Sequence, residues 1–173
     1  MAKYAPLTAT ISRQLEEIEP SISGSLKYYP CAARLANGDS LACVYVVWDE
    51  TYIKVWGVYP EQDGGKSWIR IEDVREIVES PRRLPAKFAT ELYQQGESGM
   101  GYTIFTVVFS DKSRQAYVTG NAVDFIRYPG DKGPADVVKV LPHEGRNTEM
   151  VKAPEYFGVS TPSRAITFQC RTY

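Results

Sequence analysis

The sequence predicts a mainly β protein with two short helices, an α+β fold. Runs rich in valine and tyrosine, with 12 tyrosines in the chain, favour strands. Two other stretches have the apolar spacing of amphipathic helices. The second half of the chain also resembles the first, which is compatible with two duplicated SH3-like or small-barrel units packed as one compact domain. A single sheet covered by both helices is the alternative.

The resemblance between the halves needs one insertion of two residues, which falls where a hairpin turn is expected. At an offset of 61 residues the coinciding pairs are Gly38–Gly99, Val46–Val107, Val47–Val108 and Trp48–Phe109. At an offset of 63 they are Val55–Val118, Gly57–Gly120, Asp73–Asp136, Val74–Val137 and Ile77–Val140. A repeat of this kind predicts two similar β-rich units and indicates how the chain is built, not what it does.

The chain divides into four segments that we expect to form one domain, because 173 residues suffice for one substantial core. Residues 1–26 hold a helix and its exit, and residues 27–83 form the first β repeat. Residues 84–146 add a second helix and the second repeat. Residues 147–173 are a C-terminal extension that ends in a last strand.

Both helices have recognisable ends. The first has apolar residues at i, i+4 and i+7, namely Ile11, Leu15 and Ile18, which predicts one buried stripe. Thr8 or Thr10 supplies its N-cap, and Pro20 ends it. The second helix spans residues 85–95, with Pro85 in its first turn and Gly96 as its stop.

Strands are expected between these helices and after them. Residues 41–48 predict a strand buried on both faces, entered through the turn at Asn37-Gly38-Asp39. The alternation of Tyr52, Lys54 and Trp56 with apolar residues predicts a second strand at 52–56. Further expected strands and short apolar runs lie at 32–35, 67–71, 74–78, 102–109, 114–119 and 137–141, with a strand or bend at 121–128. A last strand alternates at Ile166, Phe168 and Cys170.

Composition limits the classes of partner. With 20 basic and 21 acidic side chains the net charge is -1, so nucleic-acid binding is not expected and remains a second alternative function. The only basic cluster, Arg82, Arg83 and Lys87, is interpreted as a solvated face. No signal peptide or membrane span is apparent, so we expect a soluble, cytoplasmic protein. Three widely spaced cysteines predict buried thiols rather than a disulfide framework.

The polar residues with chemical potential lie in separate loops. The glycine-rich loop 96–101 runs from a helix into a strand, the reverse of a phosphate-binding loop or a nucleophile elbow. His143 is the only histidine, so any Ser-His pair has to use it. The ligand-binding candidates are Glu97, Ser98, Asn121, Asp124, His143 and Arg146. No catalytic residue, metal site or cofactor is predicted.

A set of aromatic residues in the first repeat is the other candidate feature. Tyr52, Trp56 and Trp68 are the interface candidates, since exposed aromatic side chains anchor protein interfaces; filling a small core is the alternative. The sequence therefore favours a non-catalytic protein-interaction or regulatory accessory domain. A small ligand-binding protein or hydrolase-like enzyme with a site between the repeats is the first alternative. The expected partner is another protein or a second copy, in a homodimer formed through the C-terminal strand.

Overall fold

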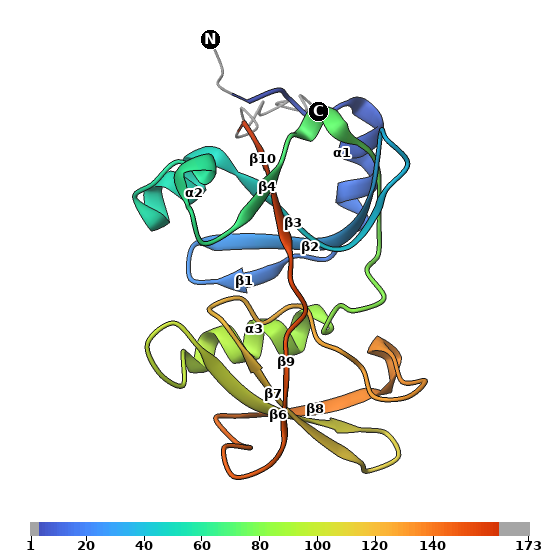
Figure 1. Cartoon of the computed structure of the whole chain (residues 1–173), viewed down its shortest axis with the longest axis vertical. Coiled ribbons are helices and arrows are strands. Elements are labelled where there is room, and N and C mark those ends of the chain that lie inside the picture. The colour runs from blue at the N-terminus through green and yellow to red at the C-terminus, as the bar shows by residue number, and fades with distance from the viewer. Residues whose placement is uncertain (1–3, 163–173) are drawn as a thin grey trace, which may run out of the picture.

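The structure is a computed structural model that describes residues 4–162 and arranges them around two β-sheets, one above the other in Figure 1. The helices are α1 (Ala9–Glu16), α2 (Asp49–Trp56) and α3 (Ala86–Gln95). The strands are β1 (Ser21–Ser23), β2 (Leu26–Leu35), β3 (Ser40–Trp48), β4 (Ser67–Ile69), β5 (Val74–Val78), β6 (Thr103–Phe109), β7 (Arg114–Thr119), β8 (Val137–Pro142), β9 (Met150–Lys152) and β10 (Phe157–Thr161). The expected last strand, at residues 166–170, lies outside the described residues.

The first sheet has the order β1-β2-β3-β10-β4, and β5 also pairs with β2. The predicted helix α1 is confirmed, and its cap is Thr8, whose hydroxyl accepts a hydrogen bond from the Ile11 amide at 3.2 Å. Ile11 and Leu15 are buried against the sheet. Gln14 ties the helix to β5, because its side-chain oxygen accepts the Ile77 amide at 2.9 Å. Burial of the apolar stripe against the sheet therefore stabilises this short helix.

Strand β10 brings the end of the described chain back into the first sheet. It lies between β3 and β4 and runs parallel to both, as the red strand that rises through the upper sheet in Figure 1. Val159, at the centre of β10, pairs with Val46 on one side and Ile69 on the other, and it is fully buried. The first sheet is therefore completed by residues that lie more than a hundred positions after β3.

The second sheet has the order β8-β6-β7-β9 and packs on α3. Phe88 and Leu92 of the helix are buried against Phe105 of β6. The opposite side of α3 contacts the first sheet, where Thr90 accepts the Ile22 amide at 3.1 Å. As a result α3 lies between the two sheets (Figure 1).

The two sheets share a pattern of backbone hydrogen bonds. In the first sheet β2 pairs antiparallel with β3 and with β5, and β10 lies parallel to β3. In the second sheet β6 pairs antiparallel with β7 and with β8, and β9 lies parallel to β7. The bonds that close the two hairpins run from Leu35 N to Asp39 O (2.8 Å) and from Phe109 N to Ser113 O (3.0 Å). The amide of the residue after each donor also makes a matching bond, from Ala36 N to Asp73 O and from Ser110 N to Asp136 O, both at 2.8 Å. The hairpins therefore correspond at an offset of 74 positions, as Leu35 and Phe109 do.

The structure does not confirm the repeat predicted from the sequence at the offset of 61 positions. The offset of 61 matches β3 with β6, whereas the strand that shares the pairing pattern of β6 is β2, which pairs antiparallel with β3 and β5. The offset of 63 does match positions with the same partners, because Ile77 pairs with Ala33 of β2 and Val140 pairs with Val107 of β6. The sheets formed by the described residues are open, so the SH3-like barrels are not observed.

The predicted strand at residues 52–56 is wrong, because residues 49–56 form α2. Asp49 and Glu50 lie in the first turn of this helix, where negative charge is favourable, and Gly57 ends it with a φ of 72°. Tyr52 and Trp56, at i and i+4, bring their rings to a centroid distance of 6.3 Å. In so short a segment, alternating large residues fit both the strand period of two and the helical period of 3.6. The residues at the ends of the segment, rather than this alternation, favour the helix.

Candidate functional site

A buried carboxylate lies where the two sheets meet. Asp124 follows β7 and is fully buried, and it accepts hydrogen bonds from the hydroxyls of Ser21, Tyr45 and Tyr93, with a distance of 2.9 Å to Tyr45. Burial raises the pKa of Asp124, opposed by these hydrogen bonds and by the charge of Arg83. Burial and the nearby carboxylate also raise the pKa values of Tyr45 and Tyr93, so both hydroxyls remain protonated donors.

Arg83 completes this network and is itself buried. Its guanidinium donates to the backbone carbonyl of Glu19 and to the Ser21 hydroxyl. The network therefore ties the N-terminal segment, β3, α3 and the loop after β7 together around a fully buried carboxylate. Asp124 is enclosed by these protein groups. Arg83 is buried and does not share an exposed basic face with Arg82 and Lys87, which corrects that part of the predicted cluster.

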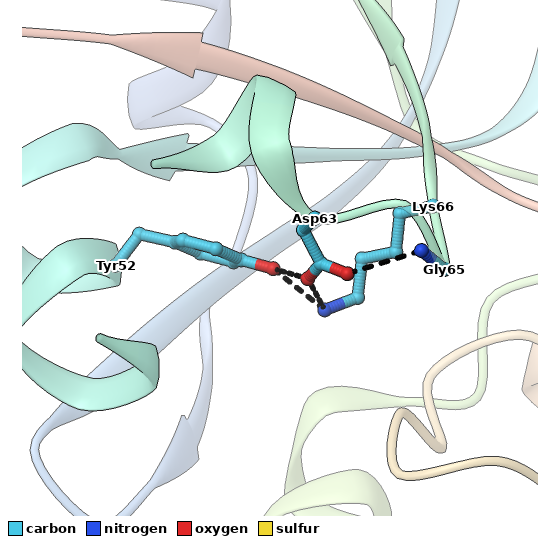
Figure 2. A network of polar contacts seen from close by, with 4 residues as sticks. All are labelled: Tyr52, Asp63, Gly65 and Lys66. Atoms are coloured by element: carbon cyan, nitrogen blue, oxygen red, sulfur yellow. Dashed lines mark hydrogen bonds and ion pairs between the residues drawn. The ribbon is translucent and has the colours of Figure 1, made fainter. Parts of the chain in front are cut away.

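A second polar network holds the loop after α2 (Figure 2). The Asp63 carboxylate accepts hydrogen bonds from the Tyr52 hydroxyl and, at 2.9 Å, from the Lys66 ammonium, and it also accepts the Gly65 amide at 3.3 Å. Lys66 reaches the Tyr52 oxygen as well, at 2.6 Å. Partial burial acts to raise the pKa of Asp63, but the bonds from Tyr52 and Lys66 outweigh it and the pKa is lowered. Burial raises the pKa of Tyr52 well above its usual range, and its bond to Asp63 adds to this shift.

Aromatic rings surround this network. The Lys66 ammonium lies 5.1 Å from the ring centroids of both Tyr52 and Trp56, a favourable cation–π arrangement. The Trp68 ring meets Tyr52 edge-on at 5.3 Å. The indole nitrogen of Trp68 is buried without a hydrogen-bond partner, which is costly for a donor. Trp68 lines a small cavity of about 20 Å³ together with Asn121 and Tyr156.

A groove of about 500 Å³ adjoins this cavity between the two sheets. Its walls come from the loop before β4, the end of β7 with the loop that follows, and the segment that connects β9 to β10. Lys66, Ala122 and Tyr156 line both the groove and the small cavity. The groove is therefore lined by the aromatic rings of Tyr156 and Phe157 and by polar side chains, which include the exposed Lys152 and Glu155. This is a usual construction for a ligand site.

The exposed apolar side chains are concentrated in one segment. Four neighbouring residues are each 37–43% exposed. They are Val55, Trp56, Val58 and Tyr59, and we call them the α2 patch. Of the interface candidates predicted from the sequence, Trp56 belongs to this patch, Trp68 is half-buried behind it, and Tyr52 is buried with an exposed fraction of 2%.

Four of the six predicted ligand-binding residues lie together in a different place, beside the loop at 96–101. The Ser98 hydroxyl lies 2.8 Å from Nδ1 of His143. Arg146 donates to the Ser98 carbonyl at 2.8 Å, and the Glu97 carboxylate accepts the Gly101 amide at 3.0 Å. The other two are not part of this cluster, since Asn121 lines the small cavity and Asp124 is enclosed in its own network.

Sequence reasoning missed Asp63 and Lys66, to which it gave no functional role. The signal available was an aspartate three residues before a lysine across two glycines, because a turn of that length can bring the two charges together. Their common partner Tyr52 could not be assigned to them while residues 52–56 were expected to form a strand. Tyr156 carried no pattern at all, and only the path of the chain from β9 to β10 brings it to the groove.

The described part of the chain has neither a group of three metal-binding side chains nor a helix long and apolar enough to cross a membrane. The buried thiols predicted for Cys31 and Cys43 are confirmed, and Cys170 lies outside the described residues. Burial raises the pKa of the Cys43 thiol to about 11. Comparison of the chain with protein-family models, with curated proteins and with solved structures gives no match.

Proposed function

We propose that this chain is a protein-interaction domain that binds a segment of a partner protein at the α2 patch, a surface to which we assign no catalytic role. The observation that carries the proposal is the concentration of exposed apolar side chains, since four of the large ones fall within residues 55–59. Scattered apolar residues are ordinary on a protein surface, whereas a contiguous group with aromatic members is typical of interfaces.

The anchoring of the patch supports the proposal. Trp56 stacks against the Lys66 ammonium, which Asp63 holds in place. Gly57 ends the helix in the left-handed conformation and directs the chain into Val58 and Tyr59. A fixed patch loses little conformational entropy on binding, which favours affinity.

The charge around the patch indicates the chemistry of the partner. Asp49 and Glu50 precede the patch and Glu61 follows it, while Lys54 is the one basic residue within residues 49–61. We expect a partner segment that presents aromatic or aliphatic anchors flanked by lysine or arginine, with an association rate that falls as salt increases.

Peptides selected from a random phage-displayed library on the immobilised chain test the proposal. We expect them to combine apolar and basic residues and to bind the double variant Val55→Ser/Val58→Ser at least about tenfold more weakly, because each lost anchor costs on the order of 1 kcal/mol. The matched control is Val78→Ser/Val138→Ser, since these valines are 38% and 53% exposed elsewhere. Equal loss in both variants, or none in either, contradicts the proposal.

The groove supports a second candidate function, the binding of a small ligand between the sheets. The specific observation is the groove of about 500 Å³, which shares lining residues with the small cavity that Trp68 lines. The indole nitrogen of Trp68 is buried without a partner, and a ligand acceptor that reaches it through this cavity satisfies the donor. A fragment set of small aromatic carboxylates and amides, followed through the indole N–H signals in NMR spectra, tests it. Movement of the Trp68 signal with Trp48 unchanged supports the ligand site, and fragments that move neither contradict it.

We also infer that the chain arose by internal duplication, with the hairpins matched at an offset of 74 positions and β5 with β8 at 63. The shared bonds, from Leu35 to Asp39 and from Phe109 to Ser113, support this. Gly38 and Lys112 both have positive φ, at 94° and 69°, so the turns are of one kind. Replacing residues 36–38 by Ser-Asp-Lys, the sequence of residues 110–112, tests it. A folded chain with a small loss of stability is expected, and loss of folding contradicts equivalence.

A further inference from the structure

We propose that Ser98 and His143 form a nucleophile–base pair that hydrolyses carboxylic esters, at a site distinct from the α2 patch and the groove. The oxygen of the Ser98 hydroxyl lies 2.8 Å from Nδ1 of His143, within the reach that proton transfer requires. The two residues come from loops that are 45 positions apart. The end of α3 and the end of β8 bring them together.

The partner of the second ring nitrogen selects the tautomer of the neutral imidazole. Nε2 of His143 lies 3.2 Å from the backbone carbonyl oxygen of Gln95. A carbonyl oxygen only accepts hydrogen bonds, so Nε2 carries the proton in this contact. In the neutral ring Nδ1 is therefore the acceptor. The Ser98 hydroxyl has two acceptors within reach, Nδ1 at 2.8 Å and the Ile104 carbonyl oxygen at 3.3 Å, and donation to the nearer one, Nδ1, is the arrangement that the proposal uses. Nucleophile, base and an orienting group are thus aligned in the order that acyl transfer needs.

The backbone holds His143 in an unusual conformation. Its φ is 63°, in the left-handed region, where residues other than glycine are uncommon. Its amide donates to the Ile104 carbonyl at 2.8 Å, and the Ile104 amide donates at 2.8 Å to the Ser98 oxygen. These reciprocal bonds to one residue fix the serine and the histidine relative to each other. Such conformations are kept where the surrounding structure enforces them, and functional sites are enriched in them.

Arg146 places a positive charge beside Ser98. Its guanidinium donates to the Ser98 carbonyl at 2.8 Å and to the Tyr102 hydroxyl at 3.2 Å, and it lies 5.6 Å from the centroid of the Tyr102 ring. A guanidinium has five N–H donors, so further donors remain for the anionic oxygen of a tetrahedral intermediate. The exposed position of His143 fits a small or extended ester better than a substrate that has to be enclosed.

The reaction balances with water as the only co-reactant. The Ser98 oxygen attacks the ester carbon as its proton passes to Nδ1 of His143, and the ester C–O bond breaks to give an acyl-serine. Nδ1 returns the proton to the departing alkoxide, which leaves as the alcohol. A water molecule then attacks the acyl-serine with the same nitrogen as base, and the carboxylic acid and free Ser98 result.

Labelling of the full chain with an alkyl fluorophosphonate tests the pair, because the Ser98 oxygen displaces fluoride from phosphorus and the proton leaves with the fluoride as HF. Peptide mapping by mass spectrometry is expected to find one adduct, on Ser98. The labelling rate should fall by about 100-fold in His143→Asn, the size of a general-base contribution. Asparagine is chosen because it tolerates the left-handed backbone. Ser113→Ala, which removes a serine in the β6–β7 turn that hydrogen-bonds to Asp111, is the control and should label at the normal rate.

A second readout separates chemistry from damage to the loop, since Ser98→Ala also removes the acceptor of the Ile104 amide. With p-nitrophenyl acetate, the intact chain should release a burst of about one p-nitrophenol per chain, and His143→Asn should abolish it while the urea midpoint stays unchanged. No adduct on Ser98, an adduct that forms as fast in His143→Asn, or equal labelling of Ser113 overturns the proposal.

Discussion

The hydroxyl of Tyr45 donates a hydrogen bond of 2.9 Å to the carboxylate of Asp124, although 79 positions separate them in the chain. Tyr45 belongs to the first sheet, and Asp124 follows the last strand of the β6–β7 hairpin in the second. The bond therefore connects the two sheets through a fully buried acceptor. Because Ser21 and Tyr93 bind the same carboxylate, this one side chain fixes how the sheets are placed against each other.

Asp124→Ala is expected to reduce the free energy of unfolding by about 3–5 kcal/mol, because it leaves the hydroxyls of three residues without their acceptor and removes the negative charge near the buried Arg83. Urea unfolding at pH 7 measures the change. Asp131→Ala is the matched control, since that carboxylate is exposed, and it should alter stability by less than about 0.5 kcal/mol. Similar losses in the two variants would show that Asp124 carries no special weight.

The pH dependence of stability should carry the sign of the raised Asp124 pKa. A carboxyl whose folded pKa is raised binds its proton more tightly in the folded state, so its contribution is full below the unfolded pKa of about 3.9 and is lost as pH rises through the folded pKa. Asp124→Asn does not titrate and serves as the reference. The stability of the natural chain relative to this variant should therefore fall between acid and neutral pH, and a difference that grows with pH contradicts the assignment.

Asp63 is expected to show the opposite slope, because its pKa is lowered. Its contribution is present above the unfolded pKa and is lost as pH falls toward the folded pKa. Asp63→Asn should cost about 0.5–1 kcal/mol at pH 7, a modest value because Asp63 and Lys66 remain partly exposed. Paired urea titrations at pH 7 and pH 3 should show this difference shrinking, and a cost that does not change with pH would exclude the charge as its source.

Gly158→Ala should displace the Trp68 ring. A Cβ at position 158 would lie 2.5 Å from the Trp68 ring, so either the indole or β10 has to move, at a cost of about 1–3 kcal/mol. Tryptophan fluorescence should shift to longer wavelength as the ring meets water. Gly64→Ala is the control, because nothing lies within 4 Å of its added Cβ. An unchanged spectrum in the Gly158 variant would mean that β10 and the Trp68 ring pack less closely than the 2.5 Å distance requires.

Local sequence signals located the elements whose ends are chemically marked. Thr8 and Gly96 bound the two predicted helices at the expected positions, because caps satisfy helix-end groups within a few residues. The hairpin at residues 103–119 followed from its polar turn. In contrast, the residue pattern at 52–56 fits both the helical period and the strand period. The segment forms a helix, in which the Tyr52 hydroxyl contacts Asp63 and Lys66.

The candidate sites divide in the same way. The glycine-rich loop and the single histidine named Ser98 and His143, yet only the folded chain brings the end of α3 beside the end of β8 to make them partners. Asp124 was noticed as a polar residue at a bend, but its burial depends on Tyr45 and Tyr93, which come from a strand and a helix far away in sequence. No local pattern contains that information.

The sequence by itself determined the mainly β character of the fold, the two predicted helices, the turns at residues 37–39 and 110–113 and the strand at residues 41–48, of which residues 43–47 are buried, because each depends on neighbours within a few positions. The turn expected at residues 49–51 was wrong, since these residues begin α2. The tertiary structure alone decided that β10 returns to pair with β3 and β4, that α3 lies between the sheets, and that Asp124 collects three hydroxyls. These features depend on contacts between distant segments, and such contacts are chosen by the burial and hydrogen bonding of the whole chain rather than by any local preference.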